Sequence, residues 1–251
     1  MVDSVLLQKQ CRELLDAYKE GLLGYSVMPE DTNPGFKDNE KEKSLAYFTF
    51  PMSLNYQRDS YKLWKAAKYT YLDNLTSDVF SVEKVTKMSN EELQKKLLKY
   101  KVALQPNKHI QTWKTLSLTI GNKWETLTKM FESVDFDFLK LKKLIQKDLK
   151  RDFPYLSGPK IFNYWSFIMI EYGKVPLRNT EYIDIAPDTH ITKCSVILNV
   201  ITQKEAEVLT KEEISKRWRD VLDNSGILPI QMHPPLWFWS RNNFQYKLRS
   251  L

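Results

Sequence analysis

The sequence predicts an all-α protein. Apolar residues recur at helical spacing in several long stretches, among them residues 4–22, 44–72 and 137–150. Helix-start signals accompany such stretches, as where Ser89 is followed three residues later by Glu92. Alternating or β-branched runs typical of strands are scarce. Helices packed on helices are therefore the expected architecture.

Composition narrows the class of protein. The 251 residues are 42% hydrophobic, enough for one large core or two smaller ones. A net charge of +7 favours an anionic partner such as nucleic acid, although many basic proteins bind no anion. Cys11 and Cys194 are too few for a disulfide framework. The three histidines, His109, His190 and His233, lack metal-ligand spacing, so no metal site is expected.

The sequence contains no apolar run of 18 residues, which predicts a protein without a membrane span. The N-terminal residues are typical of an amphipathic helix rather than of a signal peptide. We therefore expect the protein inside the cell, in the cytoplasm or nucleoid, or in the nucleus of a eukaryote.

The first part of the chain predicts two helical regions separated by a loop. Residues 4–22 are one helix, and residues 29–43 are polar and rich in breakers, which indicates a loop. The helical pattern of residues 44–72 is interrupted at residues 53–59 (SLNYQRD). This interruption is either a turn between two helices or a loop that reaches into a functional site.

Further helices follow in the middle of the chain. Ser89 is a predicted N-cap, and a helix carrying Trp113, Leu116 and Ile120 comes next. Residues 137–150 (DFLKLKKLIQKDLK) combine a leucine stripe with many lysines. The lysines are either the solvated face of a core helix or a face that contacts phosphates.

Residues 156–159 (LSGP) form a short turn that delivers Lys160 to the start of an apolar, aromatic helix. A lysine is a nucleophile only when neutral, so burial or a positive field must lower its pKa. The helix N-terminus supplies such a field, and Phe162, Tyr164 and Trp165 are candidates to desolvate the amine. The turn itself is a candidate phosphate site. The alternative is an exposed lysine that simply follows a turn.

Residues 186–190 (APDTH) place Asp188 where the next helix begins. Aspartate is among the best N-cap residues, and a capping carboxylate can also act as a base. A further helix starts at Thr210 and is closed by Gly226, before the aromatic tail 228–241. A lysine and an aspartate at successive helix starts are the minimum equipment for amine-nucleophile chemistry.

These segments resemble the helix-hairpin-helix (HhH-GPD) DNA glycosylase superfamily. Residues 158–163 (GPKIFN) resemble its Gly-Arg-Lys-Thr-Ala-Asn segment, and residues 187–190 (PDTH) are similar to its Val-Asp-Thr-His segment. Residues 52–59 (MSLNYQRD) resemble the Leu-Ser-x-Gln-x-x-Asp helix that opens the domain. The resemblance extends over residues 44–241.

Within the superfamily the archaeal 8-oxoguanine glycosylase/lyase group is the most similar branch. The loop at residues 173–187 is long, as in that group. Residues 225–230 (SGILPI) resemble its Thr-Gly-Ile-Pro-Pro-Leu, and residues 236–241 (LWFWSR) its Leu-Trp-Leu-x-Gly-Arg. The chain departs from the pattern at residues 155–158 (YLSG), which replace Pro-Gly-Val-Gly. It also departs at Phe162, which replaces a small residue, and at His233, which replaces an aspartate.

The resemblance implies a two-lobed all-α fold with the active-site cleft between the lobes. The expected lobes are residues 52–150 and residues 1–51 together with 151–251. It also implies excision of a damaged base, 8-oxoguanine first, from double-stranded DNA through a Schiff base. A monomer that needs no cofactor or metal is expected. An enzyme for an oxidised pyrimidine or alkylated base, and a non-catalytic DNA-binding module, are the alternatives.

The resemblance also assigns roles to residues. The implied site consists of the catalytic pair Lys160 and Asp188, the base-pocket residues Trp237, His233, Trp64 and Gln57, and the phosphate contacts Ser157, Gly158 and Thr189.

Overall fold

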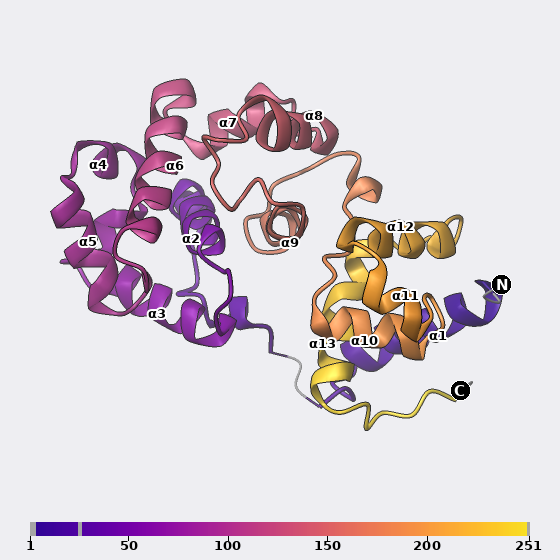
Figure 1. Cartoon of the computed structure of the whole chain (residues 1–251). Helices are drawn as coiled ribbons and strands as arrows, with labels where there is room; N and C mark the ends of the chain where they lie inside the picture. Colours follow the sequence, from indigo (N-terminus) through magenta and orange to yellow (C-terminus); the bar gives the residue numbers. More distant parts are fainter. Residues whose placement is uncertain (1–3, 25–26, 250–251) are drawn as a thin grey trace. The chain divides into compact units, whose positions relative to one another are not determined.

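The computed structural model describes residues 4–24 and 27–249 and is all-α, as predicted (Figure 1). Within this part of the chain the only β-type pairing is an isolated bridge between Asp137 and Arg178. The chain divides into two compact units. The middle unit is Pro29–Asn179, and the terminal unit combines the described parts of Met1–Met28 and Thr180–Leu251.

The units differ from the expected lobe limits, because residues 29–51 and 151–179 belong to the middle unit. The physical reason is the packing of α2 (Lys41–Ser53) against α9 (Pro159–Glu171). Trp165 Nε1 of α9 donates a hydrogen bond of 3.1 Å to Thr49 Oγ1 of α2. A shared core therefore holds together two segments that the sequence separates by more than a hundred residues.

The middle unit surrounds α2 and α9 with shorter helices. Every residue of α2 from Ser44 to Ser53 is buried, and α9 is apolar along most of its length. Stacked aromatic pairs fill the core, such as Phe50 on Trp113 and Phe131 on Trp165. The other α-helices of the unit are α3 (Ser60–Leu72), α4 (Val82–Lys87), α5 (Asn90–Lys99), α6 (Lys108–Trp124), α7 (Leu127–Ser133) and α8 (Phe138–Lys143).

Short turns complete this unit. The 3-10 turns are η1 (Pro29–Thr32), η2 (Asp38–Glu40) and η3 (Ser77–Phe80), and a π-helical turn η4 (Leu144–Asp148) extends α8.

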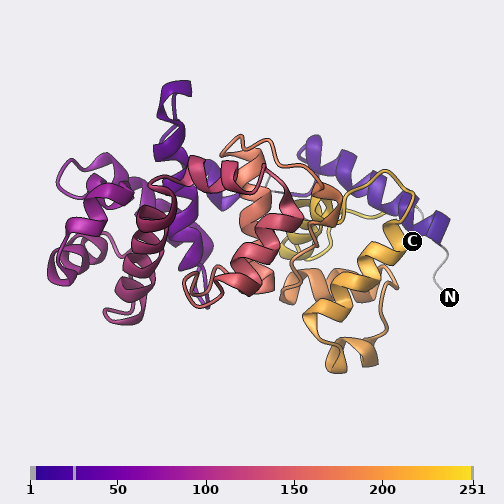
Figure 2. The same ribbon diagram turned by 90° about the horizontal axis from the view of Figure 1, so that it is seen from above.

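The terminal unit joins the two ends of the chain, as the indigo and yellow segments of Figure 2 show. Tyr18 of α1 (Ser4–Lys19) stacks on Phe238 of α13 (His233–Arg241) with ring centroids 5.8 Å apart. α13 also packs against α10 (Thr189–Ile197). The remaining helices of the unit are α11 (Gln203–Val208), α12 (Lys211–Leu222) and the 3-10 turns η5 (Thr180–Tyr182) and η6 (Pro229–Met232).

Most predicted helices are present, with some differences at their ends. The prediction of a regular α-helix over residues 137–150 is wrong in its second half. There the backbone forms the π-helical turn η4, with a hydrogen bond from Leu149 N to Leu144 O. Ser89 caps α5, but the Glu92 carboxylate binds Lys96 at 2.9 Å instead of completing a capping box. The short helices α4, α7 and α11 were not predicted, because six or seven residues carry little periodicity.

No helix in residues 4–24 and 27–249 combines the length and hydropathy needed to cross a bilayer.

A carboxylate from α2 holds the start of α7. The Glu42 carboxylate accepts hydrogen bonds from Leu127 N at 2.6 Å and from Thr128 N and Oγ1 at 3.0 and 2.8 Å. The N-terminal N–H groups of a helix have no intrahelical partner, so Glu42 supplies one from a distant part of the chain.

Replacing Glu42→Ala removes this acceptor, and we expect the free energy of unfolding to fall by about 2 kcal/mol. Urea unfolding followed by circular dichroism measures the change. Glu83→Ala is the control, because Glu83 is exposed and pairs with Lys87 across one helical turn. Equal stability of the two variants would contradict a capping role for Glu42.

Candidate functional site

In the middle unit, a hairpin at residues 149–158 connects α8 and η4 to α9. Side chains close the hairpin at both ends: Gln146 Nε2 donates to Ser157 O at 3.2 Å, and Ser157 Oγ donates to Lys150 O at 3.1 Å. The lysine-rich helix and the turn before Lys160 thus form one braced element.

Ser157 and Gly158 are predicted phosphate contacts, but their backbone N–H groups already donate hydrogen bonds within the hairpin. Ser157 N donates to Phe153 O at 2.9 Å, and Gly158 N donates to Tyr155 O at 3.0 Å. Both N–H groups therefore serve the hairpin itself. The donors that a helix start leaves to a ligand are those of Lys160 and Ile161, since Pro159 has no N–H. A phosphate site here would lie one step further along the chain than predicted.

Lys160 is exposed at the second position of α9. Phe162 and Trp165 are fully buried and lie on the opposite face of the helix. Tyr164 shares the face of Lys160, one turn further along, but its hydroxyl donates to the buried Glu30 at 3.2 Å. The prediction that these three aromatics desolvate the amine is wrong, because they pack into the core of the middle unit.

The loop at residues 54–59 contacts the hairpin. The rings of Tyr56 and Tyr155 stack with centroids 5.3 Å apart. The interruption in the helical pattern is therefore a turn between α2 and α3 that also lies beside the candidate site. Gln57, a predicted base-pocket residue, is exposed on this loop with φ +47°.

Trp64 is a core residue. It is fully buried in the middle unit, and its Nε1 donates to Glu30 Oε1 at 2.9 Å. The prediction that Trp64 stacks on a base does not agree with this burial, which leaves no accessible ring face.

Glu30 is an unexpected buried carboxyl. Its two oxygens accept from Trp64 on α3 and Tyr164 on α9, so it ties η1 to both helices. Burial raises the pKa of Glu30 to about 7, with the two side-chain hydrogen bonds acting against the rise. The sequence carried no signal for it, because a glutamate in a polar, proline-rich stretch is typical of an exposed loop.

The terminal unit carries Asp188 as the N-cap of α10. Asp188 Oδ1 accepts from His190 N at 2.9 Å and from Ile191 N at 3.0 Å, which confirms the capping prediction. Oδ1 accepts both of these hydrogen bonds, so the capping interaction does not use Oδ2. Thr189, a predicted phosphate contact, is exposed at the first position of the helix.

Aromatic and basic side chains lie beside this cap. The His190 ring meets Trp237 edge-on at 5.8 Å, and His190 Nδ1 lies 3.1 Å from Ser240 Oγ. The Arg241 guanidinium covers one face of the half-buried Trp237, 4.8 Å from the ring centroid. His233, the other predicted base-pocket residue of this unit, is buried at the start of α13. His190 therefore contacts both predicted site residues: its N–H binds Asp188, and its ring packs against Trp237.

The predicted site residues fall into two groups. The middle unit holds Lys160, Ser157, Gly158, Gln57 and the buried Trp64, and the terminal unit holds Asp188, Thr189, His233 and Trp237. Within residues 4–24 and 27–249, no three His, Cys, Asp or Glu side chains gather closely enough to hold a metal ion.

The raised pKa of Glu30 predicts a pH-dependent stability. The ordinary value is 4.5 and the folded value is about 7, so between them the folded protein keeps a proton that the unfolded chain has released. Stability therefore falls as the pH rises from about 4.5 to about 7. Glu30→Gln should remove this fall from the melting temperature measured between pH 5 and pH 7. The exposed Glu132→Gln is the control, and an unchanged slope in Glu30→Gln would contradict the assignment.

The hairpin that leads to Lys160 at the start of α9 and the aspartate cap of α10 are the features that bear on function. Each places a reactive group at a helix start, where backbone N–H groups make the surroundings positive. No protein-family model matches the chain, and no curated protein shows detectable similarity to it.

Proposed function

We propose that the protein is a DNA glycosylase with apurinic/apyrimidinic lyase activity that excises an oxidised base, with 8-oxoguanine as the first candidate. The observation that carries the proposal is the helix-hairpin-helix that presents the exposed amine of Lys160 at the start of α9. The chain divides into two compact units, with Lys160 in the middle unit and Asp188 in the terminal unit, whereas the resemblance places both residues in one lobe.

The proposed reaction begins with a damaged nucleotide flipped out of the duplex. The neutral amine of Lys160 attacks the anomeric carbon of the deoxyribose, and the carbon–nitrogen bond to the base breaks. The base leaves with the bonding electrons and takes up a proton. The resemblance assigns to Asp188 the stabilisation of the positive charge on the sugar and the uptake of the proton that the amine releases.

The resulting covalent sugar opens to a Schiff base on Lys160. Loss of a proton from the adjacent sugar carbon then expels the 3′ phosphate by β-elimination, which breaks the strand. The Schiff base explains why a lysine, rather than an activated water, is placed at the helix start.

In this proposal, exposed cationic side chains on η4 and the hairpin bind the DNA phosphates. Lys147, Lys150 and Arg151 are exposed on η4 and the hairpin, directly before Lys160. Cations at such positions neutralise phosphates without reading the sequence, so affinity should fall steeply with salt. Gln57 and Trp237 remain candidates for contact with the flipped base, and Thr189 for contact with a phosphate.

A non-catalytic DNA-binding module is the second candidate, and the exposure of Lys160 favours it. An exposed amine beside a hairpin also suits a phosphate contact. Duplexes carrying 8-oxoguanine, an oxidised pyrimidine or an alkylated base, compared in parallel, separate the candidate substrates from one another and from the non-catalytic reading.

Lys160→Gln should abolish covalent trapping. Borohydride reduces a Schiff base to a stable protein–DNA adduct, so the wild-type protein should form the adduct on lesion-bearing duplex and the variant should not. Lys123→Gln, which removes an exposed lysine from α6, is the control and should trap like wild type. Full trapping by Lys160→Gln would overturn the nucleophile assignment.

Asp188→Asn should slow base release by about 100-fold in single-turnover assays. Asparagine keeps the Oδ1 acceptor that caps α10, so helix content and melting temperature should stay close to wild type. DNA affinity, measured by fluorescence anisotropy, should change little. Equal losses in base release and DNA affinity would mean that Asp188 acts only as a cap.

A further inference from the structure

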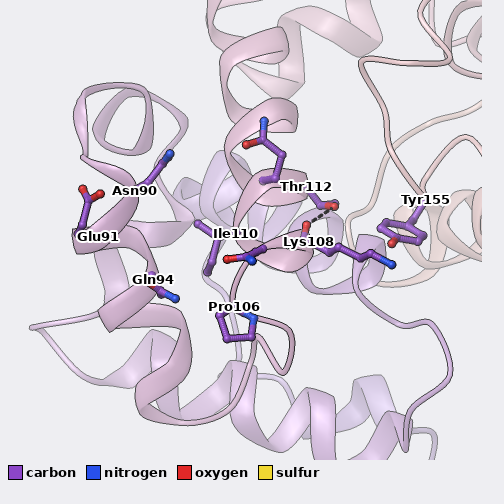
Figure 3. Close-up of a pocket in the computed structure, with 10 residues that line it drawn as sticks. Asn90, Glu91, Gln94, Pro106, Lys108, Ile110, Thr112 and Tyr155 are labelled. Carbon is purple, nitrogen blue, oxygen red and sulfur yellow. Dashed lines mark hydrogen bonds between the residues drawn. The ribbon is translucent and has the colours of Figure 1, made fainter.

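A hollow of about 630 Å³ opens in the middle unit beside the hairpin. Its walls are α5, the first turn of α6, and the ring of Tyr155 from the hairpin (Figure 3). A volume of this order falls within the range of small-ligand sites. None of the residues given a catalytic or base-pocket role above lines it.

The aromatic ring of Tyr155 lies at one end of the hollow, where its contacts restrict its position. Its backbone lies in the left-handed region, with φ +60°, which is strained for a residue with a side chain. The ring stacks on Tyr56 across the two loops, 5.3 Å between centroids. Gln57, next to Tyr56, is also left-handed, so two strained loops meet at this pair. The stacking on Tyr56 fixes the position of the Tyr155 ring at this end of the hollow.

Four of the other nine lining residues carry side-chain amides. Asn90 and Gln94 project from α5, and Asn107 and Gln111 belong to the start of α6. An amide offers both a donor and an acceptor, the combination that the edges of nucleobases present. These amides therefore suit a base better than they suit an apolar ligand or a bare anion.

Charge in the hollow is separated along its length. The Lys108 side chain extends toward Tyr155, whereas Glu91 lies on the far side, on α5 (Figure 3). A phosphate is attracted to the Lys108 end and repelled from the Glu91 end. The hollow thus has a direction, with a cation and an aromatic ring nearest the hairpin and amides beyond them.

We propose that this hollow binds one unstacked nucleotide of the DNA strand that passes over the hairpin. The base lies against Tyr155 among the amides, and its phosphate lies at Lys108. The inference rests on the proposed DNA-binding function, because the hairpin brings the strand to the rim of the hollow. It adds a second nucleotide contact, separate from the one at Lys160.

Two variants of the full chain test the hollow. Gln94→Trp fills it, and Lys108→Ala removes its cation. Binding of labelled single-stranded DNA, followed by fluorescence anisotropy, should weaken at least about fivefold in Gln94→Trp, the loss expected when one stacked base is excluded. Lys108→Ala should also reduce the slope of log Kd against log salt by about 0.7, the value for one phosphate contact.

Matched controls come from the neighbouring residue of α5. Lys95 is exposed and does not line the hollow, so Lys95→Trp adds the same ring, and Lys95→Ala removes the same kind of charge, outside the hollow. Both should bind DNA within about twofold of wild type, the spread expected of an exposed site. DNA affinity and salt slope that are the same in the hollow variants and the Lys95 variants would overturn the proposal.

Further outcomes separate this inference from the proposed function. Borohydride trapping tests Lys160 alone, so loss of DNA affinity in Gln94→Trp supports the hollow even where wild type forms no adduct. Deoxyadenosine monophosphate is the free-nucleotide probe. If it binds wild type and not Gln94→Trp while both bind DNA equally, the hollow serves a free nucleotide and the strand assignment is overturned.

Discussion

The packing of α9 against α2 is the constraint on which the middle unit depends. The two helices approach closely at their ends: a Cβ at Gly173, just after α9, would lie 2.9 Å from Met169 O and 3.1 Å from Leu45 Cδ2. Trp165 and Met169 of α9 both meet Thr49 of α2. Because interiors are close-packed, a helix held in this way has little freedom to shift along its axis. The position of Lys160 is a consequence of that packing.

Glu30 extends the same constraint to η1 and α3. It binds α9 through Tyr164 and α3 through Trp64, so an ionisable group in the core depends on the position of the helix that begins with Lys160. A buried carboxyl with two donors is destabilising when either donor is lost. This pairing explains why an otherwise aromatic core tolerates a glutamate, and it connects the pH response of the fold to the proposed catalytic helix.

The proposed chemistry uses the ends of helices rather than a deep cluster of ionisable groups. Lys160 follows a braced hairpin and Asp188 caps α10, so each reactive group is oriented by the local backbone. The hollow at Tyr155 follows a similar logic, since loop strain and stacking orient the ring. The DNA contact that we propose uses exposed cations on η4 and the hairpin, which requires few specialised residues.

Local signals in the sequence were sufficient for most of the secondary structure. Asp188, Ser89 and Thr210 cap helices as predicted, because capping depends on the neighbouring three residues. The turn before Lys160 was predicted on the same grounds, from a glycine and a proline. The π-helical turn of η4 was not predicted, and Gln146 within it forms a hydrogen bond with Ser157 O, a partner that the local sequence does not indicate.

The tertiary structure decided which side chains are buried and which residues contact one another. Trp64 and Trp237 are both predicted to stack on the flipped base, yet Trp64 is buried against Glu30 and Trp237 is half-buried beneath Arg241. The contact of Tyr56 with Tyr155, and the hollow beside it, join residues about a hundred positions apart. The sequence by itself determined which segments are helices and where their reactive ends lie, because those properties are local. Which side chains are buried, and which residues they contact, depends on packing between distant segments, so only the tertiary structure determines it.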